Sequence, residues 1–125
     1  GYTVTVKATA DPPLVDVSNN IDKFSGTNTT PTVWSSPAGS AASVNTGFFG
    51  YTTNDAVLGT GTVDRFTNVG NEWAGATTSP LEVAFSAVGV PTAEVTRVGW
   101  QAEVNTLQPS GAYTGTVVLV ATPTY

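Results

Sequence analysis

Few side chains in this 125-residue sequence could carry out chemistry. There is no His and no Cys, which excludes a Ser-His-Asp triad, a thiol nucleophile, a Cys/His zinc site and a disulfide framework. A glycosidase needs two carboxylates facing one bond, and nothing in the spacing of Glu72, Glu82, Glu94 and Glu103 brings two of them together. We therefore predict that the protein is not an enzyme and uses no cofactor.

The remaining acidic residues near the N-terminus do not predict a metal site. Asp11, Asp16 and Asp22, with Asn19 and Asn20, offer the oxygen ligands that hard cations prefer. Their spacing does not match the calcium loop, in which ligands recur at every second residue around a Gly and end with a Glu. We interpret this segment as a solvated acidic turn.

Asn28 is the one residue whose neighbours suggest a covalent modification. Asn28-Thr29-Thr30 is the only Asn-x-Thr sequon of the chain, and it lies in a stretch rich in Ser, Thr and Pro. The motif predicts a surface loop with a possible N-linked glycan in a secreted protein. The alternative is a bare loop, because 22 Thr make chance matches frequent.

The aromatic residues allow a second kind of ligand, a surface polysaccharide. Trp34, Trp73, Trp100 and Tyr51 could form a platform on which sugar rings stack. Trp100 alternates with Val98 and Ala102 and is expected in the core. A buried or subunit-interface role is favoured for the others, because interfaces also concentrate aromatic residues.

Composition and charge narrow the class of protein. Four Lys plus Arg against nine Asp plus Glu give a net charge of −5, which disfavours nucleic acid as a partner. The longest undiluted apolar run is Val117–Ala121, far short of the ~20 residues of a membrane helix. With 22 Thr and 18 Val against five Leu and one Ile, the chain favours strands over helices.

Periodicity predicts an all-β protein with a distinct N-terminal strand. Residues 2–10 alternate strictly between apolar and polar side chains, and Asp11-Pro12-Pro13 ends that strand. Further strands are expected near 14–18, 44–53, 81–87, 95–104 and 113–122. We predict a single-domain antiparallel sandwich, Ig-like or jelly-roll-like, of about 7–9 strands. It divides into an extended strand over 1–10, a Pro hinge over 11–13 and the sandwich over 14–125.

Two interpretations of the N-terminal strand are open. It is either the first strand of its own domain or a donor strand that completes the sheet of a neighbouring subunit. In the second case Pro12 and Pro13 act as a stiff hinge, and repetition head to tail produces a filament. The inserted face consists of Tyr2, Val4, Val6, Ala8 and Ala10.

The C-terminal segment resembles the final strand of pilin-like domains of bacterial surface fibres and of spore-coat-U-type proteins. Such domains end with Gly-x-Tyr, an alternating Val/Thr strand and a terminal aromatic, and the matching residues here are Gly111, Tyr113, Gly115, Val117, Leu119 and Tyr125. The resemblance implies an extracellular subunit joined by strand donation. Many chaperone–usher pilins carry a disulfide, which this chain cannot form, so a different secretion route fits better. Because the middle of 113–122 is apolar on both faces, we expect this strand inside a sheet and not at its edge.

These observations predict a structural subunit of an extracellular, pilus-like filament. Its partners would be copies of itself joined head to tail, with a surface polysaccharide as a further possibility. The chain has no Met, so Gly1 is expected to follow processing or trimming, with any signal peptide already removed. The alternatives are a carbohydrate-binding sandwich module and a viral capsid or decoration protein.

Overall fold

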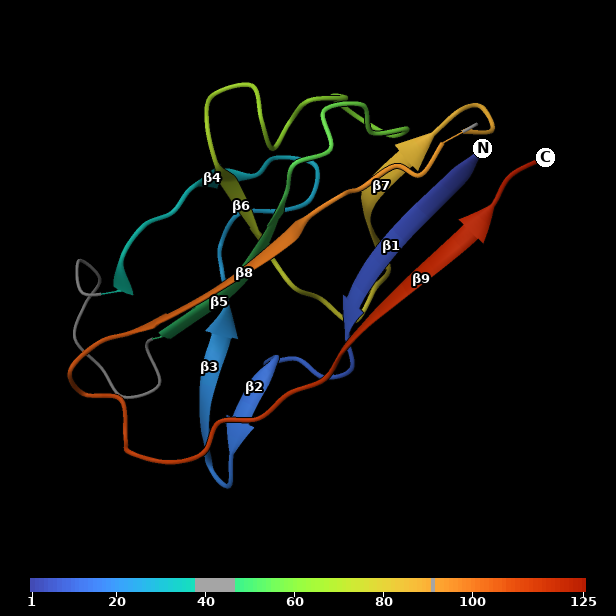
Figure 1. Ribbon diagram of the computed structural model, residues 1–125. Helices are drawn as coiled ribbons and strands as arrows, with labels where there is room; N and C mark the ends of the chain where they lie inside the picture. Colours follow the sequence, from blue (N-terminus) through green and yellow to red (C-terminus); the bar gives the residue numbers. More distant parts are fainter. Residues whose placement is uncertain (38–46, 91) are drawn as a thin grey trace.

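The computed structural model describes residues 1–37, 47–90 and 92–125, which form nine strands and no α-helix (Figure 1). This confirms the predicted all-β fold. The strands are β1 (Tyr2–Ala8), β2 (Leu14–Asp16), β3 (Asn19–Lys23), β4 (Thr32–Val33), β5 (Gly47–Thr53), β6 (Glu72–Gly75), β7 (Leu81–Ser86), β8 (Val98–Val104) and β9 (Val117–Pro123).

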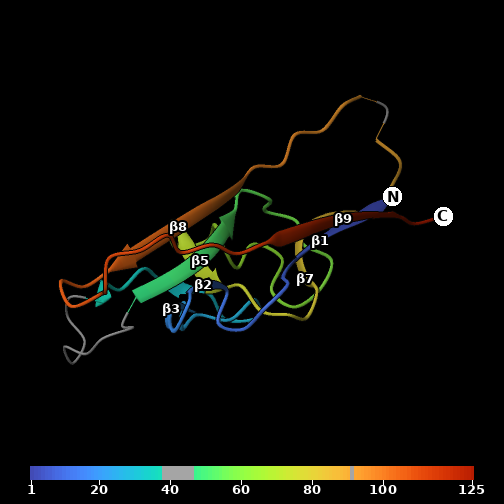
Figure 2. The same ribbon diagram turned by 90° about the horizontal axis from the view of Figure 1, so that it is seen from below.

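The strands form two sheets, visible as separate groups in Figures 1 and 2. The first has the order β7-β1-β9 and is antiparallel throughout. The second has the order β2-β3-β5-β6-β4, with β8 pairing antiparallel with β5. Its β3 and β5 run parallel, so the second sheet is mixed, whereas we expected a fully antiparallel arrangement.

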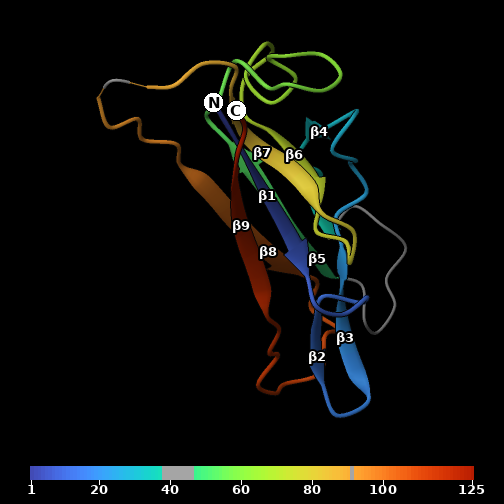
Figure 3. The same ribbon diagram turned by 90° about the vertical axis from the view of Figure 1, so that its right-hand side faces the viewer.

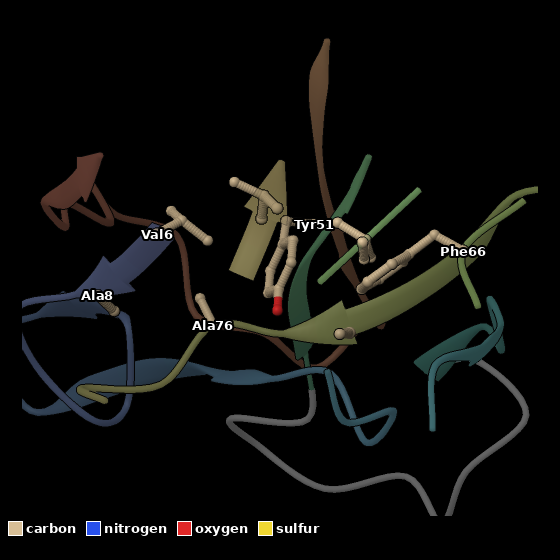
Figure 4. Packing of buried hydrophobic residues seen from close by; sticks show 8 residues of the cluster. Val6, Ala8, Tyr51, Phe66 and Ala76 are labelled. Carbon is tan, nitrogen blue, oxygen red and sulfur yellow. The ribbon is translucent and has the colours of Figure 1, made fainter. Parts of the chain in front are cut away.

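The core lies between the two sheets (Figure 4). Small and β-branched residues make up most of it, in line with the Val-rich, Leu-poor composition, and three larger side chains, Tyr51, Leu58 and Phe66, are fully buried among them. Loop residues complete the packing. The buried cluster consists of Val6, Ala8, Tyr51, Leu58, Phe66, Ala74, Ala76 and Val83.

The N-terminal strand is the central strand of the first sheet. In β1 the alternation places Val6 and Ala8 in the core cluster, with Val4 packed against it. The strand ends at Ala8, and Ala10 is exposed in the bend that follows. Ala10 therefore lies outside the strand, because the chain leaves the sheet before it reaches the prolines.

The last strand is an edge strand, which corrects our expectation for the C-terminus. Among the described residues β9 pairs with β1 alone, and Leu119 and Val120 remain 53% and 46% exposed. The strand begins at Val117 and not at Tyr113, because the preceding segment turns to meet β2 through a single bridge between Thr114 and Val15.

Candidate functional site: the β1 slot

The candidate site is the β1 slot, which we define as the space between β7 and β9 that β1 fills (Figure 3). All seven residues of β1 are paired with β9, from Tyr2 with Pro123 to Ala8 with Val117. On the other side Tyr2 pairs with Ser86 and Val6 with Leu81, with a register shift between Val4 and Thr5. The slot therefore binds its strand by the backbone on both sides, over seven residues along β9 and over five along β7.

Side chains on the inner face of β1 give the slot its specificity. Val6 and Ala8 are each 1% exposed and contact the buried cluster (Figure 4). Burying a Val side chain stabilises by about 1.5–3 kcal/mol. A charged or much larger residue at either place would not fit, since the core is closed around them.

The hinge is held at both ends. The Thr9 amide donates to the Thr116 carbonyl at 3.0 Å, and the Val15 amide donates to the Thr114 carbonyl at 3.0 Å. Between them Pro13 is buried, while Ala10 and Asp11 are exposed. The Asp11–Pro12 peptide bond is cis, and the Asp11 carboxylate forms an ion pair with Lys23.

The C-terminal motif packs against the hinge. A Cβ at Gly115 would overlap the Pro13 carbonyl oxygen, which is backbone, so this position requires glycine. A Cβ at Gly111 would displace the Asp16 carboxylate. The Tyr113 hydroxyl donates to the Pro109 carbonyl at 2.8 Å, which fixes the turn before β9. The Gly-x-Tyr part of the C-terminal motif, Gly111 and Tyr113, therefore lies in the turn that precedes β9.

Beyond that turn the motif residues differ in their burial. Val117 packs on the core, whereas Leu119 and Tyr125 are exposed.

The chain ends lie together at one end of the slot (Figures 1 and 3). The Gly1 amino group donates to the Thr124 carbonyl at 2.9 Å, and the Thr124 amide donates to the Gly1 carbonyl at 2.9 Å. At the same end the Tyr2 hydroxyl donates to the Glu94 carboxylate at 2.9 Å, and burial together with this carboxylate raises the pKa of Tyr2. These contacts add to the ladder that holds β1.

Asn28 is buried in the folded chain, whereas its sequon predicted a surface loop. The residue is 8% exposed. Its Nδ2 donates to the Tyr51 hydroxyl and to the Glu82 carbonyl, both at 2.8 Å. A sugar attached at Nδ2 would have to replace these bonds and enter the interior, so the sequon is structural here.

The sequence did not indicate the buried polar network around Asn28. The Arg65 Nη2 donates to the Asn28 Oδ1 at 2.8 Å and lies 3.6 Å from the Glu82 carboxylate. The buried Glu82 carboxylate also accepts the Gly59 amide at 2.9 Å. Burial raises the pKa of Tyr51 to about 12, against the smaller opposing effects of Asn28 and Arg65. One cation and one carboxylate thus hold the loop over 58–65 to β7.

The four aromatic residues do not form one surface. Trp34 stacks on Phe24 with ring centroids 4.5 Å apart and lies edge-on to Trp73 at 5.5 Å. Trp100 stacks on Phe49 at 5.5 Å, and Tyr51 is buried. The rings therefore pack mainly on one another, as an interior or interface role requires.

One carboxylate belongs to this aromatic group. The Trp34 Nε1 donates to the Glu103 carboxylate at 2.6 Å, and the Ser36 hydroxyl donates to its other oxygen. Donation by Ser36 and then by Trp34 holds the pKa of Glu103 below its ordinary value. Glu82, Glu94 and Glu103 each bind a different partner, so the structure does not assemble a carboxylate pair from them.

Among the residues that the structure describes, no group of three or more Asp or Glu could hold a metal ion, and no helix is long and apolar enough to cross a membrane. Comparisons with protein-family models, with curated proteins and with known structures found no match to this chain.

Proposed function

We propose that the protein is a structural subunit of an extracellular filament, in which β1 of one copy occupies the β1 slot of the next. The observation that carries this proposal is the geometry of the slot. It accepts one strand of this sequence along both sides, with Val6 and Ala8 fully buried. Because every copy has the same slot and the same strand, insertion between copies makes the same contacts as insertion within one copy.

Exchange changes only the hinge. The paired residues and the core contacts stay the same, whereas the segment over 9–13, which includes the Pro13 carbonyl that Gly115 approaches, takes a new direction. Fully extended, its five residues reach roughly 17 Å, which suits subunits in direct contact. Since the difference between the two arrangements is confined to this segment, protein concentration decides between them.

Two features of the body favour a building block over a ligand-binding module. The aromatic rings that could stack on sugars are packed on one another. In addition, β9 is joined to the described remainder of its sheet only through β1. The domain is therefore complete only when its slot holds a β1 strand, either its own or that of another copy.

A disulfide reporter tests the exchange. The chain has no Cys, and Val4 pairs with Ala121 across β1 and β9, so V4C/A121C reports whether both strands come from one copy. The protein is refolded at about 1 mM, oxidised and separated on a non-reducing gel. We expect a ladder of covalent oligomers, whereas monomer alone at this concentration would refute the exchange.

The matched control places the cysteines in the β2–β3 hairpin, where Val15 pairs with Asn20. V15C/N20C should give an intramolecular disulfide and no ladder, because strands joined by a two-residue turn stay in one copy. Deleting residues 1–10 is the second test. The truncated chain should lose assembly and regain solubility with an added peptide of residues 1–10, and assembly without β1 would contradict the proposal.

A further inference from the structure

The two outer edges of the β7-β1-β9 sheet differ in how their backbone groups are satisfied. At β7, side chains cover the edge. The Asn28 amide donates to the Glu82 carbonyl at 2.8 Å, the Thr53 hydroxyl donates to the Val83 carbonyl at 2.7 Å, and the Phe85 amide donates to the Asp55 carboxylate at 3.0 Å. This edge is closed to another strand.

The β9 edge is open. In the described part of the chain, the hydrogen bonds of residues 117–123 are those of the ladder with β1, and Leu119 and Val120 are half exposed. No side chain from Asn105 to Tyr125 is charged. Natural edge strands usually carry a charge, a bulge or a cover that prevents pairing, and β9, seven residues long, has none of these along its register.

An apolar groove runs along the inner face beside this edge. It has a volume of about 340 Å³, and β9 contributes Leu119 and Ala121 to its lining, opposite Val98 at the start of β8. The polar part of the lining is Glu94, whose carboxylate accepts from the Tyr2 hydroxyl, and Thr96. β1 and β7 line its floor through Val4 and Val83. A strand added to β9 would therefore gain backbone bonds from the edge and an apolar surface for alternate side chains.

We propose that the β9 edge pairs antiparallel with the β9 edge of a second copy, which joins two three-stranded sheets into one of six strands. Each copy has a net charge of −5, so two copies repel least where they meet through an uncharged segment. A basic strand would find no acidic side chain on β9 to pair with, and an acidic strand would find no basic side chain there. The edge therefore selects a neutral, apolar strand, which a second β9 supplies.

The other strands of a second copy are poorer partners. The β7 edge is covered, β2 and β4 have three and two residues, and β8 carries Glu103. Pairing β9 with itself is isologous, so every contact forms twice and the pair closes. It also explains why a strand that is apolar on both faces lies at an edge: in the pair, β9 becomes an inner strand.

This contact is independent of the exchange of β1. Exchange extends a filament head to tail, whereas pairing through β9 joins two copies, or two filaments, side by side. If β1 does not exchange, the β9 pair is a closed dimer of self-contained domains. A seven-residue edge is small beside the roughly 1,200–2,000 Å² of a stable interface, so we expect a dimer that dissociates on dilution.

Sedimentation of the intact chain over a range of concentrations, with amide hydrogen exchange, tests the pairing. We expect a monomer–dimer equilibrium, with slower exchange in residues 117–122 as concentration rises. V120K places a charge in the middle of the edge and should raise the dissociation constant at least tenfold. V69K is the matched control, because Val69 is 72% exposed in a loop and gains the same charge.

The outcomes separate the possibilities. A chain that stays monomeric at about 1 mM, or a dimer whose concentration-dependent protection falls outside residues 117–122, overturns the inference. So does an equal effect of V120K and V69K. The exchange measurement on the unmodified chain keeps the test valid if V120K folds poorly. A ladder from V4C/A121C, together with exchange in residues 117–122 that does not change with concentration, would retain the filament and reject the β9 pair.

Discussion

Replacing Asn28 by Ala tests whether the sequon residue is structural. In the folded chain its side chain donates to the Tyr51 hydroxyl and the Glu82 carbonyl and accepts from Arg65, each at 2.8 Å. N28A removes these three hydrogen bonds. The buried Glu82 carbonyl and the buried Arg65 guanidinium then have fewer hydrogen-bond partners. Because these groups stay shielded from water, the lost hydrogen bonds are not replaced, and the substitution lowers stability.

The expected magnitude follows from these contacts. A neutral buried hydrogen bond contributes about 1 kcal/mol and one to a charged group about 1.5–3 kcal/mol. The bond from the Arg65 Nε to the Asn28 carbonyl belongs to the backbone and persists. We therefore expect N28A to lower the free energy of unfolding by about 3–5 kcal/mol, a large share of the roughly 5–15 kcal/mol of an ordinary domain.

Urea unfolding followed by tryptophan fluorescence measures this loss. Asn71→Ala is the control, because Asn71 is exposed, and it should change stability by less than about 0.5 kcal/mol. A loss below about 1 kcal/mol for N28A would refute the role assigned to the network. Mass spectrometry of protein secreted from a glycosylating host gives a second measurement, in which folded protein should carry no glycan at Asn28.

Three further predictions concern the hinge, the core and the aromatic group. Gly115→Ala should cost at least about 2 kcal/mol in urea unfolding, because its Cβ would overlap the Pro13 carbonyl; unchanged stability would show that the hinge yields. The pKa of Tyr51 is raised to about 12, so the unfolded chain loses this proton first. Stability should therefore fall by about 1.4 kcal/mol per pH unit between about pH 10 and 12 through Tyr51. Tyr51→Phe should remove this contribution in unfolding measurements and leave that of Tyr2, whose pKa is also raised. The pKa of Glu103 is lower in the folded chain than its ordinary value of 4.5. The ionised Glu103 carboxylate therefore stabilises the fold above pH 4.5, and this stabilisation is lost as the pH falls through the pKa of Glu103 in the folded state. Trp34 fluorescence should then change in acid below pH 4.5. The E103Q variant should show no such change. If E103Q shows the same change, the assignment to Glu103 is wrong.

Local pattern was sufficient for the fold class and for the face of β1. A period of two places alternate side chains on opposite sides of a strand, so Val6 and Ala8 could be assigned to the core without knowledge of their neighbours. The need for glycine at Gly115 could not be derived from local pattern, because the carbonyl that it approaches belongs to Pro13, about a hundred positions earlier in the chain.

By itself the sequence determined that the protein is built of strands, has neither His nor Cys for catalysis, and carries a regular apolar face at its N-terminus. Tertiary structure alone decided that β1 is central, that β9 is an edge and that Asn28 is buried. The physical reason is that periodicity fixes which face a side chain takes but not which strand lies beside it. Accessibility likewise depends on segments distant in sequence, and a three-residue motif such as Asn28-Thr29-Thr30 contains no information about them.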